Sequence, residues 1–373
     1  MWRFFFQDIE ELGNDDYSFK IHDLMHDVAT SLFQNECLTV KGSNQIASKT
    51  SYRHLFFHGV DGEVATLNFI RSLSNVRSVL FSSLIGEDIT INQSFLKLLI
   101  SRFQFLRMLR LYNLSIEVVP KGIGNLMHLR YLELASNPIK KLPSSIYKQQ
   151  NLQYLSLYEC EQLEGLPREV KYLISLRLLD LTTTQRHLPS NGIGCLNSLR
   201  RLIIYGCSNL EYLCEDIGRL SALRRLIIFE CPNLISLPRG VRNLSSLEDL
   251  RILDCERLNL DLSTGSDNHD ELDSTGPSLR FLYIFNLPQL VKLPQWLLQC
   301  STDTLGEVII SNCPELSSLP DDMNRLTSLR ELKIGLCPKL RERCKPETGE
   351  DWSKIAHIPK IELDREIIKS TEN

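Results

Sequence analysis

Leucines recur along most of this chain in one repeated pattern. The pattern Leu-x-x-Leu-x-Leu/Ile-x-x-Cys/Asn restarts ten times over residues 106–340, at intervals of 23 to 32 residues. Its starting positions are Leu106, Leu129, Leu152, Leu176, Leu199, Leu223, Leu247, Leu279, Leu305 and Leu329. A period of this length is typical of a stacked solenoid, whose long surface suits binding another macromolecule better than enclosing a catalytic pocket.

One unit, residues 223–238, indicates how the pattern folds. Leu226 and Ile228 alternate with Arg225, Ile227 and Phe229, and this period of two predicts a short strand with one buried face. A unit buries about five or six aliphatic side chains, worth roughly 1.5–3 kcal/mol each. Ordering its backbone costs about 1–2 kcal/mol per residue. We therefore expect that one repeat does not fold alone and that the repeats stack through a parallel sheet.

A second signature, Leu-Pro-x-x-Ile/Val-x-x-Leu-x-x-Leu, follows the strands. Its proline position is held by Pro120, Pro143, Pro167, Pro189, Pro238, Pro294 and Pro320. Proline has a fixed φ and cannot donate to a sheet, so turns or short single-turn helices are predicted on the convex side. The predicted fold is thus an α/β solenoid with its parallel sheet on the concave face.

The pattern weakens at both ends and breaks once. Residues 76–81 fit the apolar spacing of a repeat, and Leu55 with Phe57 fit it poorly. Residues 254–277 add about eight residues to the period and are rich in Asp, Ser and Gly, which predicts a surface loop. Near the C-terminus, Trp352 and Ile355 are expected to cover the last open row of leucines.

Composition narrows the function. The net charge of −4 gives no reason to expect nucleic acid or anionic lipid as a partner. No apolar run approaches the roughly 20 residues of a membrane span, and residues 1–16 lack the pattern of a secretory signal. No nucleophile, base or metal constellation stands out, so we predict a protein that is not an enzyme.

Six of the 11 cysteines share one position in their repeats, namely Cys160, Cys207, Cys231, Cys255, Cys313 and Cys337. Asn137 holds the same position in another repeat, which indicates a buried turn that takes a small group able to bond nearby backbone. Side chains on stacked strands point the same way and not at each other, so we favour free thiols over disulfides. Zinc is disfavoured because no Cys-x-x-Cys pair exists.

The Leu-Pro repeats resemble the leucine-rich repeats of plant intracellular immune receptors. Residues 1–35 resemble the end of the winged-helix part of the nucleotide-binding module in plant disease resistance proteins of the coiled-coil class. On that resemblance Ile21, His22 and Asp23 match the family's Met-His-Asp switch, whose histidine contacts the phosphate of bound ADP. The chain has no Gly-x-x-x-x-Gly-Lys-Ser/Thr loop. We therefore expect no nucleotide binding by this chain alone and interpret it as a C-terminal fragment; ADP and ATP belong to the full-length family.

The resemblance implies four parts. These are a winged-helix remnant over 1–35, a connector with a degenerate repeat over 36–75, leucine-rich repeats over 76–343, and a cap and tail over 344–373. It also implies a cytoplasmic protein of plant innate immunity, whose location can in addition include the nucleus or the periphery of a membrane. His22 and His26 lie four residues apart, as in a zinc protease, but Asp23 replaces the glutamate base of that motif and no pocket is implied.

The candidate binding site is the concave face. Of its thirty outward positions nine are aromatic, against 8% of the whole chain, and exposed aromatics with arginines are typical of protein-binding hot spots. Strand propensity alone is the competing interpretation. The candidates are Tyr112, Tyr131, Tyr154, Tyr158, Arg201, Tyr205, Arg225, Phe229, Phe281, Tyr283 and Phe285.

An arginine column accompanies the repeats. Arginine follows the first leucine in seven of them, at Arg107, Arg130, Arg177, Arg200, Arg224, Arg280 and Arg330. We expect a solvated rim with salt bridges to nearby acids, and an acidic partner is the alternative.

Two functions remain open. The first is recognition of a pathogen effector, a guarded host protein or the receptor's own nucleotide-binding module. The second is a free-standing scaffold, such as an extracellular inhibitor or receptor ectodomain, which the sequons at Asn92, Asn113 and Asn243 permit.

Overall fold

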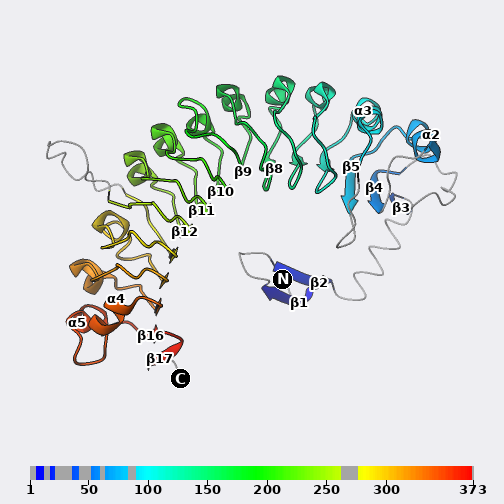
Figure 1. Ribbon diagram of the computed structural model, residues 1–373. Coiled ribbons are helices and arrows are strands. Elements are labelled where there is room, and N and C mark those ends of the chain that lie inside the picture. The colour runs from blue at the N-terminus through cyan, green and yellow to red at the C-terminus, as the bar shows by residue number, and fades with distance from the viewer. Residues whose placement is uncertain are drawn as a thin grey trace.

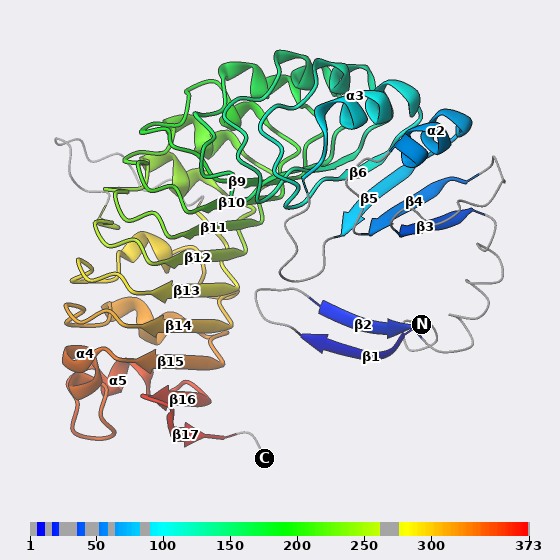
Figure 2. The same ribbon diagram turned by 45° about the vertical axis from the view of Figure 1, so that its right-hand side comes forward.

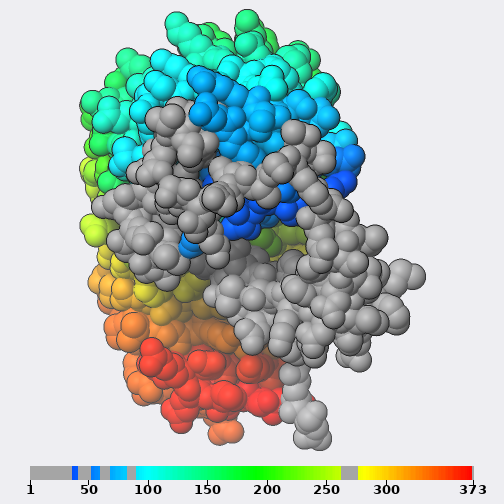
Figure 3. Space-filling model, turned by 90° about the vertical axis from the view of Figure 1, so that its right-hand side faces the viewer, coloured from blue at the N-terminus to red at the C-terminus, as the bar shows by residue number. Residues whose placement is uncertain are grey.

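The repeats fold into a curved solenoid. The computed structural model describes residues 6–11, 17–21, 36–41, 52–58, 64–82, 90–261 and 276–371. Strands line the inner side of the arc and short helices cover its outer side (Figure 1). The first and last repeats lie at opposite ends of the molecule (Figure 3).

The inner sheet has 15 strands, which follow one another in chain order. Neighbouring strands pair in parallel, as predicted, except that β17 returns antiparallel to β16 (Figure 2). The strands are β3 (Cys37–Lys41), β4 (His54–His58), β5 (Ser78–Ser82), β6 (Met108–Arg110), β7 (Tyr131–Glu133), β8 (Tyr154–Leu157), β9 (Leu178–Leu181), β10 (Arg201–Tyr205), β11 (Arg225–Phe229), β12 (Asp249–Leu253), β13 (Phe281–Phe285), β14 (Glu307–Ser311), β15 (Glu331–Gly335), β16 (Lys360–Leu363) and β17 (Glu366–Ser370).

Short helices form the outer side. Most are single 3₁₀ turns, and α-helices occur only toward the two ends of the described solenoid. The α-helices are α2 (Val64–Ser72), α3 (Gln93–Arg102), α4 (Pro338–Arg343) and α5 (Trp352–Ile355). The 3₁₀ helices are η2 (Lys121–Asn125), η3 (Ser144–Lys148), η4 (Arg168–Tyr172), η5 (Ile193–Cys195), η6 (Glu215–Arg219), η7 (Arg239–Asn243), η8 (Gln295–Leu297) and η9 (Asp321–Arg325).

Prolines mark the starts of most of these turns. Six of the seven predicted positions directly precede a 3₁₀ helix, at Pro120, Pro143, Pro167, Pro238, Pro294 and Pro320. Pro189 is the exception. The chain makes a turn at Asn191 (φ 55°) after this proline, and η5 begins only at Ile193. The backbone N–H of Asn191 donates to the carboxylate of Asp216 at 2.8 Å and holds that turn.

The shared cysteine position is a buried turn, as predicted. In five repeats its thiol lies 3.2–3.6 Å from the carbonyl oxygen two residues earlier. Asn137 uses the same position more fully: its side chain accepts from two backbone N–H groups and donates to three carbonyls. The 11 cysteines are free thiols in the structure.

A left-handed residue stands directly before this position in most repeats. Examples are Glu159, Glu230 and Asp254, with φ values of 58°, 55° and 51°. Gly206, at φ 62°, and asparagines such as Asn286 and Asn312 are residue types that this conformation favours, whereas glutamate is not. Because the residue types at this position are mixed, the sequence pattern did not reveal its left-handed backbone.

The sheet reaches further toward the N-terminus than the ten clear repeats. Leu55 and Phe57 are buried in β4, and β3 precedes it within the segment predicted as a connector. Before that, β1 (Phe6–Glu11) and β2 (Tyr17–Ile21) form a separate antiparallel pair. The rest of the predicted winged-helix segment lies outside the described residues, so that assignment stays a prediction.

Two irregular segments leave the sheet continuous. Strands β12 and β13 pair in register, Asp249 with Phe281 and Leu253 with Phe285, across the break in the period. Most of the loop predicted there lies outside the described residues. At the C-terminal end Ile355 is fully buried and Trp352 packs partly buried against the core, as expected of a cap.

Candidate functional site

The candidate side chains lie along the concave face and are half-buried. Strands β10, β11 and β13 alternate fully buried aliphatics with partly exposed residues, and the partly exposed residues are those predicted to point outward. Each of the eleven candidates has intermediate exposure. The aromatic side chains are thus only partly exposed, because strands about 4.8 Å apart stack neighbouring rings on each other.

The first cluster joins Tyr131 and Tyr154 to two buried acids. The tyrosine rings stack with centroids 4.3 Å apart. The hydroxyl of Tyr131 donates to Glu133 at 2.6 Å, and that of Tyr154 donates to Asp180 at 2.9 Å. Arg110 pairs with Glu133 at 3.1 Å and Arg201 with Asp180 at 3.3 Å.

These contacts keep the first cluster polar and ordered. Glu133 is 8% and Asp180 5% exposed. Burial raises the pKa of Asp180, and Arg201 and the hydroxyl of Tyr154 oppose that shift. Burial also raises the pKa values of Tyr131 and Tyr154, so both phenols stay protonated hydrogen-bond donors at neutral pH. The cluster presents a fixed arrangement of ring faces to an incoming partner.

The second cluster consists of Tyr158, Tyr205 and Phe229. The centroids of Tyr158 and Tyr205 lie 4.2 Å apart, and those of Tyr205 and Phe229 5.2 Å apart. Tyr205 and Phe229 occupy the same register of β10 and β11. Burial raises the pKa of Tyr205, so its hydroxyl is neutral.

The third cluster surrounds buried Asp249. Arg225 and Arg251 reach its carboxylate at 2.7 and 3.0 Å. The guanidinium of Arg251 also lies over the ring of Phe281, 4.7 Å from its centroid, which is a cation–π contact. Tyr283 and Phe285 extend the aromatic surface, with successive centroids 6.4 Å apart. Tyr112 lies beside the first cluster, with the guanidinium of Arg110 5.5 Å from the centroid of its ring.

A model of a leucine-rich repeat region matches residues 76–334, which covers more than half of the chain. The chain belongs to the leucine-rich repeat family. The curated proteins to which it is similar include plant disease resistance proteins. It is 33% identical to putative disease resistance protein RGA1 of Solanum bulbocastanum over 129 residues, which is 35% of this chain and 10% of that protein. It is 36% identical to disease resistance RPP8-like protein 3 of Arabidopsis thaliana over 89 residues, 23% of this chain and 9% of that protein.

The leucine-rich repeat chain is thus related to plant disease resistance proteins. The aligned segments span a tenth or less of these relatives' own length. Among solved structures, one of the Toll–Spätzle complex of Drosophila matches with a TM-score of 0.57 and 18% identity, over 82% of this chain and 44% of that one. At this identity the match concerns the fold alone.

Three concave acids were not predicted as site residues. Glu133, Asp180 and Asp249 each anchor an arginine of the leucine-rich repeat sheet, and two of them also bind tyrosine hydroxyls. Their position on the predicted strands was visible in the sequence. What the sequence did not show is that their carboxylates are buried beneath those side chains.

The arginine column differs from the prediction. All seven arginines are exposed, but among the described residues only Arg224 makes an ion pair, 3.8 Å from Glu248. The repeat places these arginines along one edge of the leucine-rich repeat sheet, mostly next to one another, which leaves few acids within reach.

The remaining candidates lie at the limits of the described chain. Ile21 ends β2, and His22 and Asp23 lie outside the described residues. Within the parts of the chain that the structure describes, no three His, Cys, Asp or Glu side chains are grouped to hold a metal ion. In those same parts no helix is long and apolar enough to cross a membrane.

Proposed function

We propose that this chain is the recognition region of a plant immune receptor and that its concave face binds a protein. The observation that carries the proposal is the set of three ordered aromatic clusters along that face, two of which contain arginines. Rings and guanidinium groups that are already held in place lose little conformational entropy when a partner covers them. The relationship to disease resistance proteins supports an immune role. A pathogen effector, a guarded host protein and the receptor's own nucleotide-binding module are the candidate partners.

The nucleotide switch belongs to the same proposal. In a longer receptor Ile21, His22 and Asp23 would contact the phosphate of ADP, and the leucine-rich repeats would restrain that module until a partner binds. A hydrogen bond to a charged group is worth about 1.5–3 kcal/mol, enough to move an off–on equilibrium by roughly 10- to 150-fold. We place the receptor in the cytoplasm and assign the chain no catalytic role.

Substitutions in the second cluster test the concave face. We expect the triple variant Tyr158→Ser, Tyr205→Ser and Phe229→Ser, made in the full receptor, to abolish pathogen-triggered cell death or to cause it constitutively. Removing a hot-spot ring costs about 2 kcal/mol or more of binding energy. The measurement is cell death in leaf tissue at matched protein levels, with the thermal midpoint of the purified repeat chain as a check of folding.

A tyrosine on the convex side provides the control. Tyr172 in η4 is 52% exposed and lies away from the concave clusters, so Tyr172→Ser should leave signalling unchanged. Unchanged signalling by the triple variant would show that the concave face is not the recognition surface.

Thiol oxidation separates this proposal from an extracellular scaffold. The thiol of Cys37 is exposed and eight of the other cysteines are buried. We expect alkylation of the unfolded chain, purified from plant tissue without reductant, to modify all 11 cysteines. Intact mass should show no glycan on Asn92, Asn113 or Asn243. Blocked cysteines together with glycan mass would favour the extracellular alternative.

A further inference from the structure

A notch interrupts the arginine column between β13 and β15. Arg280 and Arg330 hold the column position in the flanking repeats, and Gly306 holds it between them. Backbone hydrogen bonds fix this order: the N–H of Gly306 donates to the carbonyl of Arg280, and the N–H of Arg330 donates to that of Gly306, both at 2.9 Å. The two arginines therefore start about 10 Å apart, twice the strand spacing.

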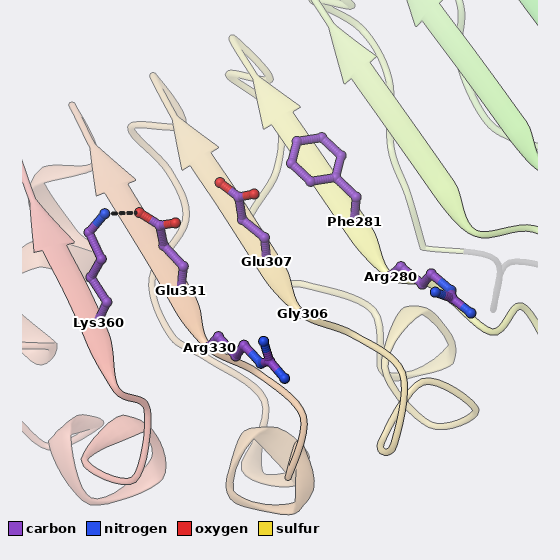
Figure 4. A pocket seen from close by; sticks show the side chains of 7 residues that line it. All are labelled: Arg280, Phe281, Gly306, Glu307, Arg330, Glu331 and Lys360. Atoms are coloured by element: carbon purple, nitrogen blue, oxygen red, sulfur yellow. Dashed lines mark ion pairs between the residues drawn. The ribbon is translucent and has the colours of Figure 1, made fainter. Parts of the chain in front are cut away.

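The absence of a side chain at Gly306 opens the notch. A cavity of about 380 Å³ lies there, lined by Arg280, Phe281, Gly306, Glu307, Arg330, Glu331 and Lys360. Figure 4 shows Arg280 and Arg330 extending in the same direction on either side of Gly306. A Cβ at Gly306 would meet only the Arg280 carbonyl oxygen at 3.6 Å, an ordinary contact, and its φ is not left-handed. The fold therefore does not require glycine here.

The acidic side chains around the notch pair with lysines and not with Arg280 or Arg330. Lys333 binds Glu307 at 3.1 Å and Glu331 at 3.0 Å, and Lys360 binds Glu331 at 2.7 Å. Burial opposes ionisation of Glu331, but the two ammonium groups outweigh it and lower the pKa of Glu331 below its ordinary value. Glu331 is thus ionised, and both acids pair with lysines. Arg280 and Arg330 make no ion pair with any described residue, so the site has a local excess of two positive charges.

We propose that this notch binds a dianionic oxyanion of the phosphate monoester class. Two guanidinium groups that extend from either side of Gly306 can each donate to a different phosphoryl oxygen, and the excess charge matches a dianion better than a single carboxylate. The ring of Phe281, which lines the cavity, offers a surface for an aromatic ester group. The site lies where the strands begin and borders the third concave cluster, with which it shares Phe281.

Phenyl phosphate is the probe that tests the notch. We expect calorimetric titration of the folded chain at low ionic strength to show binding at one site, and the double variant Arg280→Gln and Arg330→Gln to bind at least tenfold more weakly. Arg200→Gln is the matched control, because Arg200 is an exposed arginine of the same column with no notch beside it. Its affinity should stay within twofold of the unmodified chain.

Filling the notch is an independent test that keeps both arginines. Gln153 holds the column position in another repeat, so Gly306→Gln introduces a side chain that this position accommodates. We expect an unchanged thermal midpoint and at least a tenfold loss of affinity for phenyl phosphate. The proposal is overturned if the unmodified chain does not bind, if Arg200→Gln weakens binding as much as the double variant, if Gly306→Gln binds normally, or if benzoate binds as tightly as phenyl phosphate.

Discussion

Single residues at the turn after each strand help to hold neighbouring repeats together. The cysteine position was recognisable from the sequence, because Cys holds it in six repeats and Asn in one. Its partners were not recognisable: Asn137 reaches Leu111 and Leu114 in the preceding repeat, about 25 positions back. Contacts at that distance follow from stacking geometry, which no local pattern encodes.

Replacing Asn137 should destabilise the chain strongly. Asn137→Ala removes the acceptor for the N–H groups of Leu114 and Ile116 and the donor to three carbonyls. A buried polar group left without a partner costs about 1–3 kcal/mol, so we expect a loss of about 3 kcal/mol or more. Urea unfolding monitored by circular dichroism measures it.

Asn137→Cys is the control for this position. Cysteine is the native residue at the equivalent place in Cys231 and Cys255, where the thiol lies close to a carbonyl oxygen two residues earlier. This variant should lose clearly less stability than the alanine variant. Equal losses would mean that the amide hydrogen bonds of Asn137 contribute little.

At the scale of elements, the convex side was predictable where chemistry fixes the backbone. Pro143 and Pro238 directly precede η3 and η7, because their fixed φ suits the residue before a turn. Cys214 directly precedes η6 in the place of a proline. Because cysteine does not fix φ, the start of η6 could not be predicted in the same way. Strand β3 was missed for a related reason: Cys37–Lys41 has strand alternation but lacks the leucines of a full repeat.

The C-terminal cap depends on one buried carboxylate. Asp351 is fully buried, and Arg343 donates to both of its oxygens at 3.1 Å. Lys354 and the backbone N–H of Leu319 lie 3.0 and 2.9 Å from it. Asp351 thus ties α4 and α5 to the last complete repeat.

The stability supplied by Asp351 should depend on pH in a defined direction. Burial opposes ionisation of Asp351, but Arg343, Leu319 and Lys354 outweigh it and hold its pKa below the ordinary 3.8. A depressed folded pKa means that the contribution is complete above about pH 3.8 and is lost as the pH falls through the lower folded value. We expect Asp351→Asn to cost about 2 kcal/mol or more at pH 7.

The measurement is the difference in unfolding free energy between the unmodified chain and the Asp351→Asn variant. The gap in unfolding free energy should stay constant from pH 7 to about pH 4 and shrink below it, because the native carboxylate is then protonated. Glu350→Gln is the control, since Glu350 is an exposed neighbour that also pairs with Arg343. A gap that widens on acidification would contradict the assignment.

At the scale of the whole molecule, each repeat contacts mainly its two neighbours. The long period made the solenoid and its parallel sheet predictable, because stacking is the only way for such short units to bury their leucines. For the binding surface, the sequence predicted which residues lie on the concave face but not how their side chains contact one another. The arrangement of Tyr131, Tyr154, Asp180 and Arg201 into one network depends on which strands are adjacent and on how far neighbouring rings lean together.

Nearest-neighbour stacking predicts that damage stays local. Leu226, fully buried in β11, contributes to the leucine rows shared with β10 and β12. We expect Leu226→Ala to cost about 2–5 kcal/mol through the cavity it leaves. Hydrogen exchange should accelerate at the backbone amides of β10, β11 and β12 while β5 and β15 keep their protection, because opening in a solenoid need not cross the whole array. Equal acceleration in all five strands would instead show that the described repeats unfold as one cooperative unit.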